Sequence, residues 1–92
     1  MIRSFRSKAL RRYVEQEDRS KLSVANVARL DRILTRLDAA IRPEQMDQAG
    51  WRFHPLKGSM KGRYAVDATA NWRLTFGWDG EDAIEVDLED YH

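Results

Sequence analysis

The sequence predicts an α+β domain in which two N-terminal helices pack on one face of a twisted, mainly antiparallel sheet. Three observations lead to this fold class. An apolar stripe with helical spacing runs from Val24 to Ile41, period-two segments separated by turn residues follow from Trp51 onward, and the chain has 92 residues. A chain of this length buries only about 60 to 65% of its unfolded surface, so we expect residues 1–92 to form one domain.

The first half of the chain contains the predicted helices. Residues 1–5 alternate between apolar and polar side chains, which suits a short edge strand, and a basic helix is expected over residues 8–15. Ser23 is the expected N-cap of the second helix, which Pro43 ends; one further turn is expected over residues 43–48. The apolar stripe of this helix comprises Val24, Val27, Leu30, Leu34, Leu37 and Ile41.

The second half of the chain is expected to form the sheet. Residues 52–56 are extended and interrupted by Pro55, as at a sheet edge, and residues 57–62 form a glycine-bounded loop. Residues 63–69, 71–78 and 83–88 have the composition of strands, and the turn Asp79-Gly80 joins the last two. If both helices cover one face of this sheet, the other face is free to form a concave site.

Charge is divided unevenly along the chain. Residues 1–63 carry 15 Lys and Arg against 7 Asp and Glu, a net charge of +8, whereas residues 64–92 carry 1 against 8, a net charge of −7. A basic surface could bind RNA, with Lys61 and Arg63 the residues that this charge argument adds to the candidates. Alternatively, the two sets of charges pair with each other across an ordinary solvated surface.

The composition also indicates the cellular compartment in which the protein is expected. The chain has no cysteine, no apolar run like a signal-peptide core near its start, and no stretch of about 18 apolar residues that could span a bilayer. We therefore expect a soluble, cytoplasmic protein that has no contact with a membrane.

Two groups of side chains near the middle of the chain could carry chemistry. His54 and Lys57 lie three residues apart around a stiff proline, although an exposed strand end would have the same composition. Period-two alternation places Arg73 on the sheet face opposite to Leu74 and Phe76, where a guanidinium could bind phosphate in a bidentate manner. Pairing of Arg73 with an acidic strand residue such as Glu85 is the alternative.

The chain ends on three side chains that can transfer protons or bind substrate, Asp90, Tyr91 and His92, although most terminal tripeptides are frayed and have no role. Nothing in the sequence indicates a metal or a cofactor. Two histidines without cysteine give no metal-ligand spacing, and no glycine-rich phosphate loop begins a helix. A metal-independent acid-base reaction is the chemistry that remains.

These groups, in this order, resemble the HigB branch of the RelE superfamily of bacterial toxins. The resemblance rests on His54-Pro55-Leu56-Lys57-Gly58, then Gly62-x-Tyr64, then residues 71–76 (NWRLTF), and finally residues 89–92 (EDYH). It is specific over about the last 40 residues. Over the first 50 residues, only the order of strand and helices and the general basicity agree.

The resemblance implies a microbial-ribonuclease-like fold and a ribosome-dependent endoribonuclease that cleaves translated mRNA at the A site of the 30S subunit, in contact with rRNA. It also implies neutralisation by a HigA-like antitoxin with a helix-turn-helix domain. The functional positions of the family fall on His54, Lys57, Arg73, Asp90, Tyr91 and His92, all of which are present.

Two other functions remain open from the sequence. A ParE-like toxin would share the fold and poison DNA gyrase by contact, although such a binding protein needs no converging proton carriers. A small nucleic-acid-binding module is supported only by the basic first half, which has no recognisable recognition helix after a glycine turn.

Overall fold

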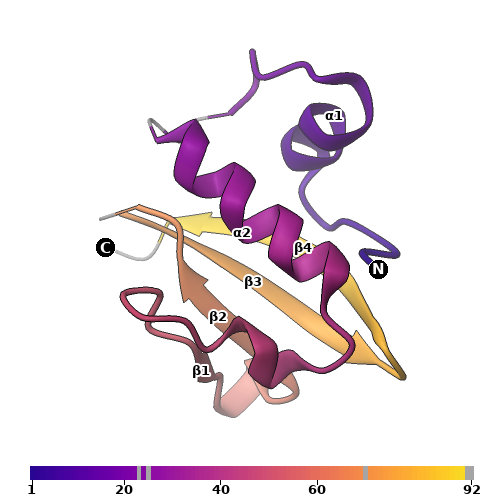
Figure 1. Ribbon diagram of the computed structural model, residues 1–92, viewed down its shortest axis with the longest axis vertical. Helices are drawn as coiled ribbons and strands as arrows, with labels where there is room; N and C mark the ends of the chain where they lie inside the picture. Colours follow the sequence, from indigo (N-terminus) through magenta and orange to yellow (C-terminus); the bar gives the residue numbers. More distant parts are fainter. Residues whose placement is uncertain (23, 25, 70, 91–92) are drawn as a thin grey trace.

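The computed structural model describes residues 1–22, 24, 26–69 and 71–90 and has the predicted α+β architecture (Figure 1). The helices are α1 (Lys8–Gln16) and α2 (Val27–Ala39), with short 3-10 turns η1 (Pro43–Met46) and η2 (Gly58–Met60). The strands are β1 (His54–Pro55), β2 (Arg63–Asp67), β3 (Trp72–Asp79) and β4 (Asp82–Asp90), which form an antiparallel sheet in the order β1-β2-β3-β4.

The expected basic helix is confirmed as α1. Ser7 is its N-cap and accepts a hydrogen bond from the backbone N–H of Leu10 at 3.1 Å. The helix ends at Glu17, which adopts a left-handed conformation with φ +56° and donates its backbone N–H to the carbonyl of Tyr13. Leu10 is fully buried and Tyr13 packs partly buried against the core, so both side chains attach α1 to it.

The second helix is shorter than the apolar stripe predicts. The cap of α2 is Asn26, whose side chain accepts from the N–H of Arg29 at 3.1 Å; the expected cap, Ser23, lies outside the described residues. The assignment of Ile41 to the buried stripe is wrong, because α2 ends at Ala39 and the side chain of Ile41 is 53% exposed. Arg42 precedes Pro43 and is extended, as residues before proline tend to be.

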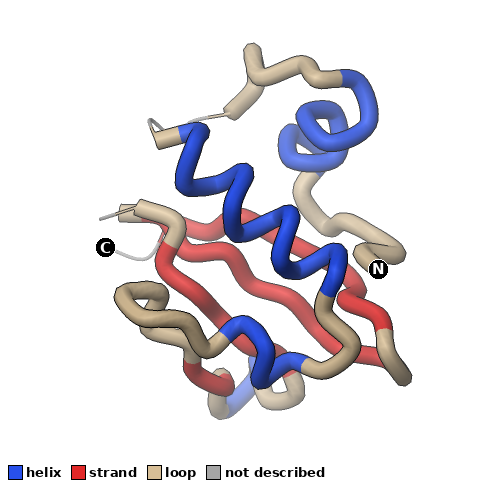
Figure 2. Tube along the Cα trace, viewed as in Figure 1, coloured by secondary structure: helices blue, strands red, loops and turns tan. Residues whose placement is uncertain are grey.

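The core lies between α2 and one face of the sheet. Figures 1 and 2 show α2 in front of the sheet, running roughly along the direction of β3 and β4. The core comprises fully buried side chains from α2 and from all three of these strands: Leu30, Ile33, Leu37, Val66, Leu74, Phe76 and Val86. Leu74 and Phe76 point toward the helix, as the period-two pattern predicts.

A bulge interrupts the pairing of β3 with β4, and the sequence pattern did not predict it. Thr75 pairs with Asp87 and Gly77 pairs with Ile84, so two steps along β3 oppose three steps along β4. Glu85 supplies the extra residue and has a left-handed backbone with φ +48°. Because of the bulge, the side chains of Ile84 and Asp87 lie on the same face of the sheet.

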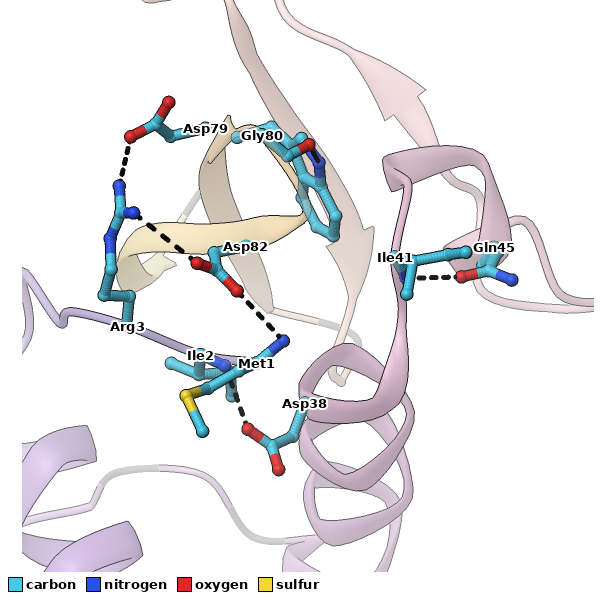
Figure 3. Close-up of polar contacts among 10 residues, drawn as sticks. Met1, Ile2, Arg3, Asp38, Ile41, Gln45, Asp79, Gly80 and Asp82 are labelled. Carbon is cyan, nitrogen blue, oxygen red and sulfur yellow. Dashed lines mark hydrogen bonds and ion pairs between the residues drawn. The ribbon is translucent and has the colours of Figure 1, made fainter.

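The N-terminal segment forms the edge of the sheet next to β4, as expected for residues 1–5. It runs parallel to β4 through isolated bridges between Ile2 and Ala83 and between Phe5 and Val86. Figure 3 shows how the polar groups reinforce this edge: the Met1 ammonium lies 3.5 Å from an Asp82 carboxylate oxygen, and the Ile2 N–H donates to Asp38 of α2 at 2.9 Å.

Some basic residues of the first half of the chain form ion pairs with acidic residues of the second half. Arg3 pairs with Asp79 and Asp82 at the hairpin that joins β3 to β4 (Figure 3), and Arg6 pairs with Glu85 at 3.4 Å. These pairs are exposed, and each contributes about 0 to 1 kcal/mol. Within the described ranges, no helix is long and apolar enough to cross a membrane.

Candidate active site

The face of the sheet opposite to α2, here called the open face, carries two rows of mostly polar side chains. Directly paired residues of antiparallel strands project from the same face. The pairing therefore places His54 of β1 in one row with Ala65, Thr75 and Asp87. The neighbouring row consists of Asp67, Arg73 and Glu89. The register thus assigns an imidazole and a guanidinium, two of the predicted catalytic groups, to the same face.

His54 is exposed, and a backbone hydrogen bond anchors its ring. Its Nδ1 lies 2.7 Å from the carbonyl oxygen of Arg52. A carbonyl oxygen can only accept, so Nδ1 carries the proton and, in the neutral imidazole, Nε2 carries the lone pair. Arg52 has a left-handed backbone with φ +53°, a conformation that is unfavourable for residues other than glycine and is often found at functional sites.

Arg73 occupies the middle of the second row. Its Nη2 lies 3.7 Å from Oε1 of Glu89, and both side chains are 25% exposed. The acidic neighbour suggested by the sequence, Glu85, is not this partner, because Glu85 lies at the bulge and pairs with Arg6. The neighbour is Glu89 because the bulge shifts the register of β4 by one residue.

Arg63 lies nearly buried on the open face, with 8% of its surface exposed. Its Nη2 donates to the hydroxyl oxygen of Thr75 at 3.0 Å and to the carbonyl oxygen of Glu85 at 2.8 Å. Burial lowers the pKa of Arg63, and the nearby positive charge of Arg6 lowers it further. This placement favours a role within the sheet face over the direct RNA contact that the charge argument assigned to Arg63.

The two predicted lysines belong to the loop after β1. Lys57 and Lys61 cap the two ends of η2, and both are exposed. Gly58 and Gly62 have φ values of +67° and +95°, so glycine is required at both positions to form this tight loop. The loop presents two exposed ammonium groups at the β1 edge of the sheet, the edge that carries His54.

The predicted chain-end residues are described only in part. Asp90 is the last residue of β4, is exposed, and pairs with Trp72, which places it on the face opposite to Arg73. Tyr91 and His92 lie outside the described residues. The register therefore brings His54 and Arg73 to one face and does not bring Asp90 to that face.

Sequence reasoning missed the acidic and hydroxyl groups that surround Arg73. The Thr75 hydroxyl donates to Oε2 of Glu89 at 2.5 Å, and Arg52 pairs with Asp67 at 3.5 Å. Thr75 lies two residues after Arg73 in β3 and therefore on the same face of the sheet. Glu89 could have been found from the spacing of the apolar residues in β4, because Ala83, Val86 and Leu88 are three and then two residues apart.

Two other observations limit the chemistry. In the part of the chain that the structure describes, no three His, Asp or Glu side chains lie close enough together to hold a metal ion. A groove of about 560 Å³ lies on the outer side of α2, away from the open face. It is lined by Asp31, Arg32, Thr35, Arg36, Ala39, Gln48 and Trp51, without a histidine.

Solved structures share this arrangement of helices and strands. YafQ from E. coli strain BL21(DE3) has a TM-score of 0.62 at 16% sequence identity, and the match covers 98% of this chain and 93% of YafQ. A point mutant of YafQ from E. coli gives the same TM-score and coverage at 20% identity. At these identities, the likeness shows the fold alone.

Sequence comparison identifies the family. The model of the HigB-like toxin family, described as the RelE-like toxin of the type II toxin-antitoxin system HigB, matches residues 3–92. Endoribonuclease HigB from Proteus vulgaris is 34% identical over 92 residues, which is the full length of both proteins. The chain belongs to the HigB-like toxin family, and the family predicted from residues 54–92 is confirmed.

Proposed function

We propose that this toxin is a ribosome-dependent endoribonuclease that cleaves translated mRNA in the A site of the 30S subunit without a metal ion. The observation that carries the proposal is the anchored His54 ring, which lies on the same sheet face as Arg73 and has its basic nitrogen free of the anchoring hydrogen bond. Membership of the HigB-like family and the name of the P. vulgaris relative support RNA cleavage.

The proposed reaction begins at the ribose 2′-hydroxyl. Nε2 of His54 takes the hydroxyl proton while the oxygen attacks the adjacent phosphorus, a role suited to the lone pair of a neutral imidazole. Negative charge then develops on the phosphorane oxygens, where Arg73 and Lys57 stabilise it. His92 protonates the departing 5′-oxygen, Tyr91 positions the nucleotide, and Asp90 orients an imidazole or fixes the chain end.

The partners of the toxin follow from the same proposal. The exposed Lys61 in the loop after β1 contacts RNA of the ribosome, where a lysine contributes mainly as a point charge. In the cytoplasm, a HigA-like helix-turn-helix antitoxin binds the toxin and suppresses growth arrest. Coexpression with that antitoxin is expected to restore growth.

The decisive experiment incubates the toxin with pre-assembled ribosomes that carry mRNA and maps the new RNA 5′ ends. We expect cuts within the A-site codon, none on the same mRNA without ribosomes, and none with His54→Ala. A Lys8→Ala variant is a matched control because Lys8 lies on α1, away from the open face. Growth arrest without new 5′ ends would overturn the proposal and would favour the alternative that the toxin binds DNA gyrase.

A further inference from the structure

The open face contains a chain of polar contacts that ends at Arg73. Arg63 donates to the Thr75 hydroxyl at 3.0 Å, the Thr75 hydroxyl donates to Oε2 of Glu89 at 2.5 Å, and Oε1 of Glu89 lies 3.7 Å from Nη2 of Arg73. These contacts cross β2, β3 and β4 in turn. The Arg63 guanidinium is thus connected to the predicted phosphate-binding guanidinium through one hydroxyl and one carboxylate.

The backbone around Arg63 makes room for this arrangement. Arg63 pairs with Gly77, and a Cβ at Gly77 would lie 3.7 Å from Nη1 of Arg63 and 3.2 Å from Cγ1 of Ile84. Without that side chain, the guanidinium crosses β3 and reaches β4. There it binds the carbonyl oxygen of Glu85, which the bulge supplies.

Stability alone does not explain why an arginine occupies this position. Nε and Nη1 of Arg63 are buried, and neither has a hydrogen-bond partner among the described residues. Burying a charged group with unsatisfied donors is unfavourable, and an apolar side chain of similar volume is often at least as stable in such a place. The feature that an apolar residue could not reproduce is the pair of hydrogen bonds from Nη2.

We propose that Arg63 and Thr75 are positioning residues for cleavage, acting through Glu89 on Arg73. The Thr75 hydroxyl holds one oxygen of Glu89, so the carboxylate stays at 3.7 Å from Arg73 and does not close into a tight bidentate pair. A tight pair would neutralise Arg73 and turn its donors toward Glu89. Arg63 in turn holds the Thr75 oxygen, which fixes the direction of the hydroxyl proton.

This inference rests on the proposed function, because it assigns Arg73 to the charge that develops during RNA cleavage. It differs from a direct RNA contact by Arg63, which the 8% exposure of that residue disfavours. It also differs from a purely structural role, in which any loss of activity would follow the loss of folded protein.

The test measures single-site cleavage on pre-assembled ribosomes for Thr75→Val, which removes the hydroxyl at nearly constant volume, and for Arg63→Gln. We expect kcat to fall about 10- to 100-fold, as for a small misplacement of a catalytic group, while KM for the ribosome complex changes less than about twofold. Arg63→Lys should recover part of the lost rate. Arg6→Gln is the matched control, because it removes a neighbouring arginine outside the contact chain, and its rate should equal that of the wild type.

Combining variants separates the possible roles. The double variant Arg63→Gln/Thr75→Val should be no slower than the slower single variant, and Thr75→Val should add less than about threefold when Arg73 is already lysine. If the rate losses of the two single variants multiply in the double variant, the role is structural. The same conclusion follows if the cleavage rates of the variants decrease in parallel with their thermal stability. A raised KM with a smaller salt dependence for Arg63→Gln would show a direct RNA contact.

Failure of this inference is distinct from failure of the proposed function. If the wild-type toxin cleaves ribosome-bound mRNA and Thr75→Val cleaves it at the same rate, the positioning role is overturned and the proposed function stands. If the wild type does not cleave, the proposed function fails and the positioning role falls with it. Thr75→Val keeps the test decisive even if Arg63→Gln does not fold.

Discussion

Replacing Arg73 with alanine should abolish growth arrest while the protein stays folded. The Arg73–Glu89 ion pair, which this change removes, is a long one at 3.7 Å, with both side chains 25% exposed. Such a pair contributes at most about 1 kcal/mol. For a domain of this size, that corresponds to a decrease in Tm of at most about 4 to 8 °C. Glu89 would keep its hydrogen bond from Thr75, so no buried carboxylate is left without a partner.

The effect on cleavage should be much larger. A preorganised donor at developing charge contributes about 3 kcal/mol to transition-state stabilisation, and each 1.36 kcal/mol is about tenfold in rate, so cleavage should fall by somewhat more than 10²-fold. Arg73→Lys should restore only part of the rate, because an ammonium cannot reproduce a bidentate phosphate contact. Cleavage on programmed ribosomes, growth arrest in cells and thermal unfolding check the three expectations.

Two results would refute this reasoning about Arg73. If Arg73→Ala unfolds at the growth temperature, Arg73 is a principal structural residue and the loss of toxicity has no bearing on catalysis. If the variant is folded and fully toxic, Arg73 has no part in the reaction. Glu89→Gln is a useful companion, since it removes the same ion pair and leaves the guanidinium in place.

Three further predictions address the reaction and the fold. Cleavage should proceed in EDTA and leave a 5′-hydroxyl on the downstream fragment, because in the proposed mechanism the attacking group is the substrate's own hydroxyl; fragments with a 5′-phosphate would exclude this mechanism. Deleting His92 should lower cleavage about 10²- to 10⁴-fold with little change in Tm, and full growth arrest without His92 would overturn its role as acid. Hydrogen bonds from the Ser20 hydroxyl and N–H hold the pKa of Asp18 below its ordinary value, so Ser20→Ala should raise that pKa in an NMR titration. The stabilisation from Asp18 is present above the ordinary pKa of an aspartate and is lost as the pH falls through the lowered value; an unchanged titration would exclude the Ser20 hydroxyl as a cause.

The sequence predicted those elements whose signals are local. The stripe that contains Leu30, Leu34 and Leu37 predicted α2, and the alternation around Arg73 predicted which face of β3 it occupies; the structure confirms both. The prediction failed for Ile41, because hydrophobic spacing does not show where a helix ends. The exposed Ile41 N–H binds Gln45 at 2.6 Å after the chain has left the helix (Figure 3).

Much of the candidate site depends on long-range pairing, which a single sequence does not display. The contacts from Arg63 to Thr75 and from Thr75 to Glu89 join residues on different strands, and their existence depends on the register. A regular strand over residues 83–88 was predicted, and the bulge at Glu85 changes which acidic residue faces Arg73. The family resemblance identified the candidate residues, but it could not show that the His54 ring is held by the Arg52 carbonyl.

The bulge makes β4 unusually sensitive to changes in chain length. On either side of Glu85, the alternation is regular: Ala83, Val86 and Leu88 face the core, and Ile84, Asp87 and Glu89 face the other side. Loss of Glu85 alone would leave every other residue of β4 on its present face and would remove the carbonyl acceptor of Arg63. Loss of Asp87 would instead exchange the faces of Leu88 and Glu89, moving a carboxylate into the core and a leucine out of it. Single-residue deletions two positions apart would therefore have opposite outcomes, one a folded protein with an altered polar network and the other a disrupted core.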